Sequence, residues 1–257
     1  MGSGMWRVFS ASVTGKRNLE QGIAGQDASH WVVLDDQLVA IVCDGAGSAA
    51  EARAGAAFIA RALADDLSST IQAARRAPAT EIGAPEAAIA VAIENARVGL
   101  AEIAASRRLP LQDFSCTLVG CAVSSEGGWL FHIGDGFAIQ QGVDGDSVLS
   151  RPENGEYADE TYFVTDENWK DHLRLTPLAP PERGSVIGLM SDGTAPFAVN
   201  RERSGFFRPF IDPIAAFLRD TTMPHGNESL RTLLESPRAS EISTDDKTLL
   251  LAFVGIP

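Results

Sequence analysis

Two long helical segments follow each other directly in the first half of this 257-residue chain, without a strand between them. Ala, Ile, Leu and Phe recur at helical spacing from Ala49 to about Arg76, and the segment ends before Pro78. A second helix is predicted from about Pro85 to Arg108, with Pro110 beyond its end. Because a parallel α/β fold alternates one strand with one helix, this order argues against that class.

Short β-rich runs flank the helical pair on both sides. Upstream, a strand is predicted over Val8–Val13, followed by a hairpin formed by Trp31–Leu34 and Leu38–Cys43. Downstream, Gly- and Asp-rich turns join four strands that are predicted as an antiparallel meander: Ser115–Val123, Trp129–Ile133, Phe137–Gln141 and Ser147–Leu149. The remaining chain is predicted to form two strands and two helices: Val186–Met190, Thr248–Val254, Pro213–Arg219 and Ser229–Leu234.

These elements predict an α+β fold in which two packed antiparallel β-sheets are flanked by helices. No internal repeat or low-complexity linker divides the sequence, so we expect a single domain over residues 1–257. The first five residues lack the charged and apolar regions of a signal peptide, and we expect them to be an artificial or disordered end.

The charge balance limits the classes of partner. The formal net charge is −13, from 34 acidic against 21 basic residues, which argues against binding to nucleic acid or to an anionic membrane. No run of about 18 apolar residues occurs, so no transmembrane helix is expected. Three cysteines without CxxC spacing, Cys43, Cys116 and Cys121, are expected to be small buried hydrophobic residues. We therefore expect a cytoplasmic protein.

Four aspartates share one setting, at the end of an apolar run beside a glycine or a second acid: Asp44, Asp135, Asp192 and Asp245. One Asp-Gly pair is a weak signal, because it is the commonest hairpin dipeptide. Several carboxylates at one end of a sheet, however, would repel one another unless cations held them. Oxygen ligands alone suit Mg²⁺ or Mn²⁺ better than Zn²⁺. The pattern therefore predicts a site for hard divalent cations.

The order and spacing of these motifs resemble the metal-dependent protein phosphatases of the 2C type, in particular their compact bacterial branch. The resemblance extends from about Ser10 to Val254. It rests on the motifs Gln26-Asp27-Ala28, Asp44-Gly45, Ser115-Cys116-Thr117, Gly134-Asp135-Gly136, Pro152–Tyr157, Ser191-Asp192-Gly193 and Asp245-Asp246-Lys247-Thr248.

The resemblance implies a protein serine/threonine phosphatase that hydrolyses phosphomonoesters with a water activated between two Mg²⁺ or Mn²⁺ ions. Asp44 would bridge both ions, and the Gly45 carbonyl would ligate one of them. Asp192 and Asp245 would hold the other ion, and these two residues with Asp44 would form the catalytic set. The implied substrate is a phosphorylated protein, and a cognate serine/threonine kinase is the natural partner.

Further roles follow from the same resemblance. Asp135 would belong to a weaker position for a third ion. Asp27 would contact water around the ions without being a ligand itself. Many members carry a phosphate-binding arginine where this chain has Gly22, and Arg17 is the candidate that could replace it.

Other positions depart from the family pattern. Ala46 stands where a histidine often protonates the leaving group, and such general acid help is worth about 10²–10⁴-fold. We expect His132 to be an ordinary structural histidine rather than a substitute. Gln26 replaces an acid in the opening motif, and Pro196 stands where some relatives carry an acid for the third ion.

An acidic segment runs from Asp144 to Asp171, with nine acidic and two basic residues. Its net charge of −7 is over half of the excess of the whole chain. One interpretation is a solvated loop. The other is a flap that selects a basic partner, and it predicts that reversing Glu153, Glu156 and Asp159 to Lys changes rates on protein substrates only.

Two other functions compete with a phosphatase. Gly45–Ala50 fits the glycine pattern of a dinucleotide-binding loop, with Asp65 about 20 residues on. Asp44 would then place a carboxylate against the pyrophosphate, and the second parallel strand is missing. The other alternative is a weak or inactive phosphatase-fold module that binds a phosphoprotein, which Ala46 and Gly22 favour. The complete set of main metal carboxylates argues against it.

Overall fold

The computed structural model describes residues 6–76, 85–152 and 161–255. Within these ranges, ten strands form two five-stranded sheets in which every neighbouring pair is antiparallel. The first sheet has the order β1 (Trp6–Val13), β10 (Lys247–Val254), β9 (Val186–Met190), β6 (Phe137–Gln141) and β7 (Ser147–Ser150). The second has the order β2 (Ala28–Leu34), β3 (Gln37–Cys43), β4 (Leu118–Ser124), β5 (Gly127–Ile133) and β8 (Arg174–Leu178).

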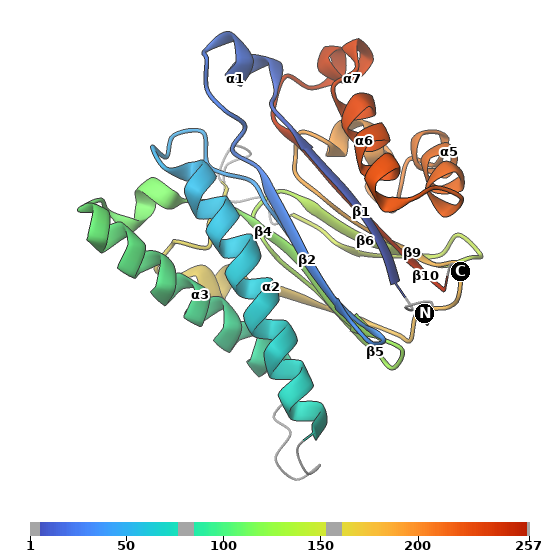
Figure 1. Cartoon of the computed structure of the whole chain (residues 1–257), viewed down its shortest axis with the longest axis horizontal. Helices are drawn as coiled ribbons and strands as arrows, with labels where there is room; N and C mark the ends of the chain where they lie inside the picture. Colours follow the sequence, from blue (N-terminus) through green and yellow to red (C-terminus); the bar gives the residue numbers. More distant parts are fainter. Residues whose placement is uncertain (1–5, 77–84, 153–160, 256–257) are drawn as a thin grey trace.

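Helices cover the outer face of each sheet, which confirms the α+β fold with two flanked antiparallel sheets (Figure 1). The long helices α2 (Ala52–Arg76) and α3 (Pro85–Arg107) lie side by side over the second sheet. The first sheet is covered by α5 (Arg208–Arg219), α6 (Met223–Leu234) and α7 (Pro237–Ile242). Shorter helical turns complete the described chain: α1 (Lys16–Glu20), α4 (Ala195–Ala198), η2 (Leu111–Phe114) and η3 (Trp169–His172).

The alternation of side chains along β3 explains why every residue of this strand is buried. Val39, Ile41 and Cys43 face α2 and α3, whereas Leu38, Ala40 and Val42 face the other sheet. The core therefore has three apolar layers: one under α2 and α3, one between the sheets, and one under α5–α7. The three cysteines are free and buried in these layers, as predicted.

The antiparallel neighbours of β3 overturn the dinucleotide-binding interpretation, which requires parallel strands on a sheet. The predicted four-strand meander is also wrong in part, because β4 and β5 belong to one sheet and β6 and β7 to the other. The chain changes sheets at Gly134-Asp135-Gly136, where Gly134 adopts φ 108°. After this turn, β6 pairs with β9 instead of continuing the hairpin from β5.

Several boundaries also differ from the prediction. Helix α2 begins at Ala52 rather than Ala49, α5 at Arg208 rather than Pro213, and α6 at Met223 rather than Ser229. Prolines Pro209 and Pro224 occupy the first turns of α5 and α6, where the missing N–H costs nothing. Strand β8 was not predicted from the sequence. In the described part of the chain, no helix is both long enough and apolar enough to span a membrane. The expectation for the first five residues lies outside the described ranges.

Candidate active site and metal centre

Strand register brings the four predicted aspartates to one end of the two sheets. Antiparallel pairing sets the end of β9, which leads to Asp192, against the start of β10, which follows Asp245. In the other sheet, the bridge between Gly45 and Cys116 places Asp44 beside the chain that enters β4. Asp44, Asp135, Asp192 and Asp245 consequently line one cavity of about 180 Å³.

The loop after β3 is fixed by hydrogen bonds to the segment before β4. The Thr117 amide donates to the Asp44 carbonyl at 2.8 Å, and the Asp44 amide donates to Thr117 Oγ1 at 3.1 Å. A Cβ at Gly45 would lie 2.8 Å from the Gln26 carbonyl oxygen and 2.9 Å from Ala52 Cβ. Glycine is therefore required here because the chain passes between α2 and the residues before β2.

Asp27 is not among the described residues that line the cavity, but its charge acts on Asp44, and Ser191 holds it in place. The Ser191 hydroxyl donates to Asp27 Oδ2 at 2.7 Å and accepts from the Thr248 amide at 3.0 Å. Among the described atoms, the buried oxygens Asp27 Oδ1 and Asp192 Oδ1 have no hydrogen-bond partner. Asp192, which lines the cavity, thus keeps an oxygen that an external ligand or cation could use.

Asp245 and its neighbour Asp246 have different surroundings. Arg17 Nη2 lies 2.7 Å from Asp245 Oδ1, so the predicted phosphate-binding arginine contacts a predicted metal ligand. Asp246 is buried, and its carboxylate accepts from the Gly15 and Gln26 amides, both at 2.6 Å, and from Asn18 Nδ2 at 2.9 Å. Asp246 therefore ties α1 and the segment before β2 to the site.

Asp135 lies in the turn between the sheets and also lines the cavity. Thr161 donates its hydroxyl proton to Asp135 Oδ2 at 2.7 Å. Thr161 and Phe163 of the following segment line the same cavity. The described C-terminal part of the acidic segment therefore forms one wall of the site.

The cluster has strong electrostatic consequences. Burial raises the pKa of Asp44 well above its usual value, and the charges of Asp27 and Asp192 raise it further. Burial raises the pKa of Asp27 to about 7, partly offset by hydrogen bonds from Ser191 and Thr248. The pKa of Asp192 is raised, chiefly by burial and then by the charges of Asp135 and Asp245. Without cations, these carboxylates cannot all be ionised at low cost.

The donor set fits Mg²⁺ or Mn²⁺. The cavity offers carboxylate and carbonyl oxygens, the unpartnered Oδ1 of Asp192, and carboxylates whose raised pKa values favour neutralisation by a cation. As the side chains stand, however, no three His, Cys, Asp or Glu residues in the described ranges are arranged to hold one ion. The carboxylate of Asp245 instead forms an ion pair with Arg17. The ligand roles of Asp44, Gly45, Asp192, Asp245 and Asp135 therefore stay predictions.

The structure also places the residues at which the sequence departs from the pattern of the 2C-type phosphatases. Ala46 lines the cavity and is buried against Ala49, Ala52 and Phe163. His132 is buried in β5, with Nδ1 3.3 Å from Ser150 Oγ, and is not among the described residues that line the cavity. Gly22 lies in an exposed turn after α1 with φ 69°.

Ser191, Asp246 and Lys247 belong to the motifs described above, but no role could be predicted for them from the sequence. Lys247 is buried, and its ammonium group donates to the Asp245 carbonyl at 2.9 Å. Burial lowers the pKa of Lys247, which the charges of Asp246 and Asp245 oppose. The sequence signal for Lys247 was a charged residue at the start of the otherwise mainly apolar strand β10. The flap prediction for Glu153, Glu156 and Asp159 lies outside the described residues.

Comparison with known proteins gives concordant results. The family model described as protein phosphatase 2C matches residues 14–235. Serine/threonine-protein phosphatase 3 of Escherichia coli (strain K12) is 30% identical over 258 residues, which covers 96% of this chain and 98% of that protein.

Solved structures share the fold at lower identity. The serine/threonine phosphatase Stp1 from Staphylococcus aureus has a TM-score of 0.62 and 17% identity, with 99% of this chain and 98% of that chain covered. RsbX, crystallised in complex with magnesium, has a TM-score of 0.58 and 14% identity, with 99% and 98% covered. These likenesses support the two-sheet architecture and by themselves say nothing about this chain's ligands.

Proposed function

The chain belongs to the protein phosphatase 2C family of serine/threonine phosphatases, and from this we propose that it hydrolyses phosphoserine or phosphothreonine in proteins with Mg²⁺ or Mn²⁺ as cofactor. The observation that carries the proposal is the convergence of Asp44, Asp192, Asp245 and Asp135 on one small cavity. Mutual repulsion and burial make this arrangement costly unless it binds cations.

Each residue has a separate task in this proposal. Asp44, in the loop after β3, would contribute to both ion positions, and the Gly45 carbonyl would contribute to one of them. Asp192 and Asp245 complete one position, and Asp135 contributes to a weaker third one. When bound, the ions supply an activated water for in-line attack on phosphorus and offset the charge that develops on the phosphoryl oxygens.

The surrounding residues orient this set. Asp27, fixed by Ser191, orients water near Asp44 through the Oδ1 atom that has no described partner. Arg17 is exposed at the rim, and its guanidinium group can exchange Asp245 for a phosphate oxygen of the substrate. With Ala46 in place of a histidine, solvent protonates the leaving group, because no described imidazole lines the cavity.

Substrate class and location are part of the same proposal. The substrate is a phosphorylated protein, and a cognate serine/threonine kinase is the partner that we propose. The Escherichia coli relative, a serine/threonine-protein phosphatase by name, supports this class of substrate. Three free, buried cysteines support a reducing compartment such as the cytoplasm.

Hydrolysis of p-nitrophenyl phosphate with Mn²⁺ tests the proposal. We expect Mn²⁺-dependent turnover by the natural chain and a loss of about 100-fold or more in Asp192→Ala, because a ligand is removed. Asp212→Asn is the matched control, since Asp212 is an exposed acid on α5 that pairs with Arg208. Equal rates for the natural chain and Asp192→Ala in both Mg²⁺ and Mn²⁺ would favour the inactive, phosphoprotein-binding alternative.

A further inference from the structure

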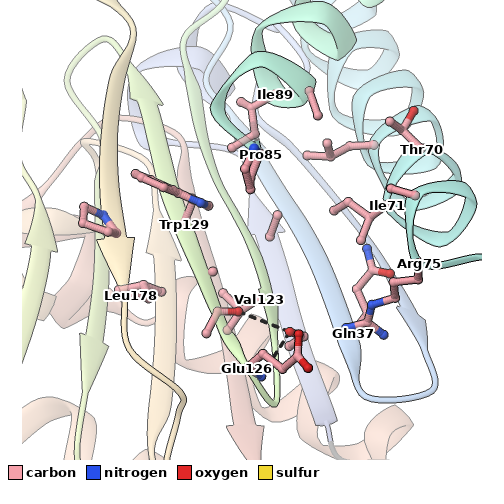
Figure 2. Close-up of a pocket in the computed structure, with 18 residues that line it drawn as sticks. Gln37, Thr70, Ile71, Arg75, Pro85, Ile89, Val123, Glu126, Trp129 and Leu178 are labelled. Carbon is pink, nitrogen blue, oxygen red and sulfur yellow. Dashed lines mark hydrogen bonds between the residues drawn. The ribbon is translucent and has the colours of Figure 1, made fainter. Parts of the chain in front are cut away.

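A second cavity, of about 500 Å³, lies between the helices and the second sheet, and its lining differs from that of the carboxylate site. Its walls come from the end of α2, the start of α3 and the strands β4, β5 and β8 (Figure 2). Ile71, Ile89, Trp129 and Leu178 give it a mainly apolar surface. Cavities of this size and character are typical of small-molecule sites.

One buried amide lies at the edge of this cavity, and both of its polar atoms are covered in the ligand-free protein. Gln37, the first residue of β3, is 1% exposed, yet neither its Nε2 nor its Oε1 has a hydrogen-bond partner among the described atoms. Gln37 has the same parity along β3 as Val39 and Ile41, so its side chain lies on the helix side of the sheet. Figure 2 shows it between β3 and α2, beside Arg75 and Ile71. An unpaired buried amide destabilises the free protein.

The charges around the cavity favour a neutral ligand. Among the described lining residues, Arg75 and Glu126 are the charged ones. Arg75 Nη1 lies 2.6 Å from Asp36 Oδ1, which holds the pKa of Asp36 well below its usual range and balances the charge of the arginine. Glu126 is an exposed residue of the β4–β5 turn. Little net charge therefore remains to select an ion.

We propose that this cavity binds a neutral, planar, mainly apolar small molecule that carries a hydrogen-bond donor next to an acceptor on one edge, as in a lactam or an aminoheterocycle. When the Gln37 side chain turns from its covered position toward the cavity, its carbonyl oxygen accepts from the ligand donor and its NH₂ group donates to the ligand acceptor, a two-point pairing that glutamine also makes with adenine. The indole of Trp129, on the same face of the sheet, offers an apolar surface to the ring.

This site is separate from the proposed phosphatase centre. Gln37 begins β3, and Asp44 follows the end of the same strand. At about 3.3 Å per residue, the seven steps between them span about 23 Å. No residue is common to the linings of the two cavities within the described ranges. The proposal thus does not depend on metal binding or on hydrolysis.

Two matched probes test the site on the full chain. The lactam 2-quinolinone carries both donor and acceptor, and 1-methyl-2-quinolinone lacks the donor. Ligand-observed NMR titration is expected to give about tenfold tighter binding of the lactam, as one lost buried hydrogen bond predicts. Gln37→Met should bring the two dissociation constants together. It should also raise the melting temperature of the ligand-free protein, because the unpaired amide is gone.

Two further variants serve as controls. Gln141→Met changes a buried glutamine of β6, outside this cavity, and should preserve the preference for the lactam. Ile71→Trp fills the cavity and should abolish binding of both probes. Equal affinities of the two probes for the natural chain, an undiminished preference in Gln37→Met, or no binding at millimolar concentration would each overturn the proposal. Self-association that Ile71→Trp abolishes would instead identify a second copy as the occupant and equally overturn it.

Discussion

Arg17 and Asp245 form the contact through which the candidate site is most easily perturbed. Arg17 Nη2 and Asp245 Oδ1 are 2.7 Å apart, with side-chain exposures of 52% and 35%. An ion pair this exposed is worth at most about 1 kcal/mol because water screens it. The contact therefore competes with a cation for Asp245 but does not block its binding.

Replacing Arg17 by Gln should consequently have two opposite effects. The Mn²⁺ concentration for half-maximal activity should fall about two- to fivefold, because a competing charge worth up to about 1 kcal/mol leaves Asp245. The KM for p-nitrophenyl phosphate should rise, because the candidate phosphate-binding group is lost. Initial rates at varied Mn²⁺ and substrate measure both. Lys16→Gln, which removes a neighbouring exposed charge paired with Glu20, is the control. An unchanged KM would remove Arg17 from the proposed phosphate site.

The sequence allowed the carboxylates to be predicted but not their partners. Asp44, Asp135, Asp192 and Asp245 could be identified because each follows or precedes an apolar strand, and register then brings strand ends together. The Ser191–Asp27 hydrogen bond joins residues 164 positions apart. No local pattern encodes such a contact, since it arises only when both sheets are packed. The Arg17–Asp245 contact was missed for the same reason.

Helix α2 reaches from the loop after Asp44 to the second cavity, and Gly55 packs directly against the backbone of a neighbouring segment. A Cβ on Gly55 would lie 2.0 Å from the Phe114 carbonyl oxygen, which belongs to the turn η2 before β4. This glycine therefore sets how closely α2 approaches the chain that positions Ser115 and Thr117.

Gly55→Ala is predicted to destabilise the protein, although alanine is the better helix former by about 1 kcal/mol. The clash with backbone forces α2 outward, at a net cost of about 1–3 kcal/mol. Gly99→Ala on α3 is the comparison, because its Cβ would meet only the end of the Phe58 ring, at 2.9 Å. Urea unfolding of both variants measures the difference in free energy. If Gly55→Ala proves as stable as the natural chain, the close contact described here is wrong.

Long periodic elements were predicted well, whereas short ones and sheet membership were not. The apolar periodicity of α2 and α3, and the continuous apolar run of β3, reflect burial that is already visible in sequence. Strand β8, with Pro177 and only one buried residue, carries a weak pattern. The transfer from β5 to β6 depends on pairing with β9, about fifty residues later, which turn residues alone do not specify.

At the scale of the whole molecule, a group of aspartates gathers at one end of two stacked sheets. Raised pKa values of Asp27, Asp44 and Asp192 mean that the ion-free fold favours their protonated forms. For a carboxyl group whose folded pKa is raised, the stabilising contribution is complete below its ordinary pKa of 3.8 and is lost as pH rises through the folded value, about 7 for Asp27. Bound cations should restore the stability that ionisation of these carboxyl groups removes.

The ion-free protein, prepared with EDTA, should therefore lose thermal stability between about pH 5 and about pH 8. Added Mn²⁺ should raise the melting temperature more at the higher pH, because ions and protons compete for the same carboxylates. Asp27→Asn should flatten the pH dependence of the ion-free protein. Differential scanning fluorimetry across this range, with and without Mn²⁺, provides the measurement. If Mn²⁺ raised the melting temperature equally at about pH 5 and about pH 8, ions and protons would not compete for the same carboxylates.

The central claim is that the convergent aspartates hold two divalent ions, on which every assigned role depends. Calorimetric titration of the EDTA-treated, dialysed full chain with Mn²⁺ tests it most directly. We predict two ions bound per chain and the loss of both in Asp44→Asn, because Asp44 is the bridging ligand in the proposed site. No saturable binding at millimolar Mn²⁺, or identical binding by the natural chain and Asp44→Asn, would contradict the account.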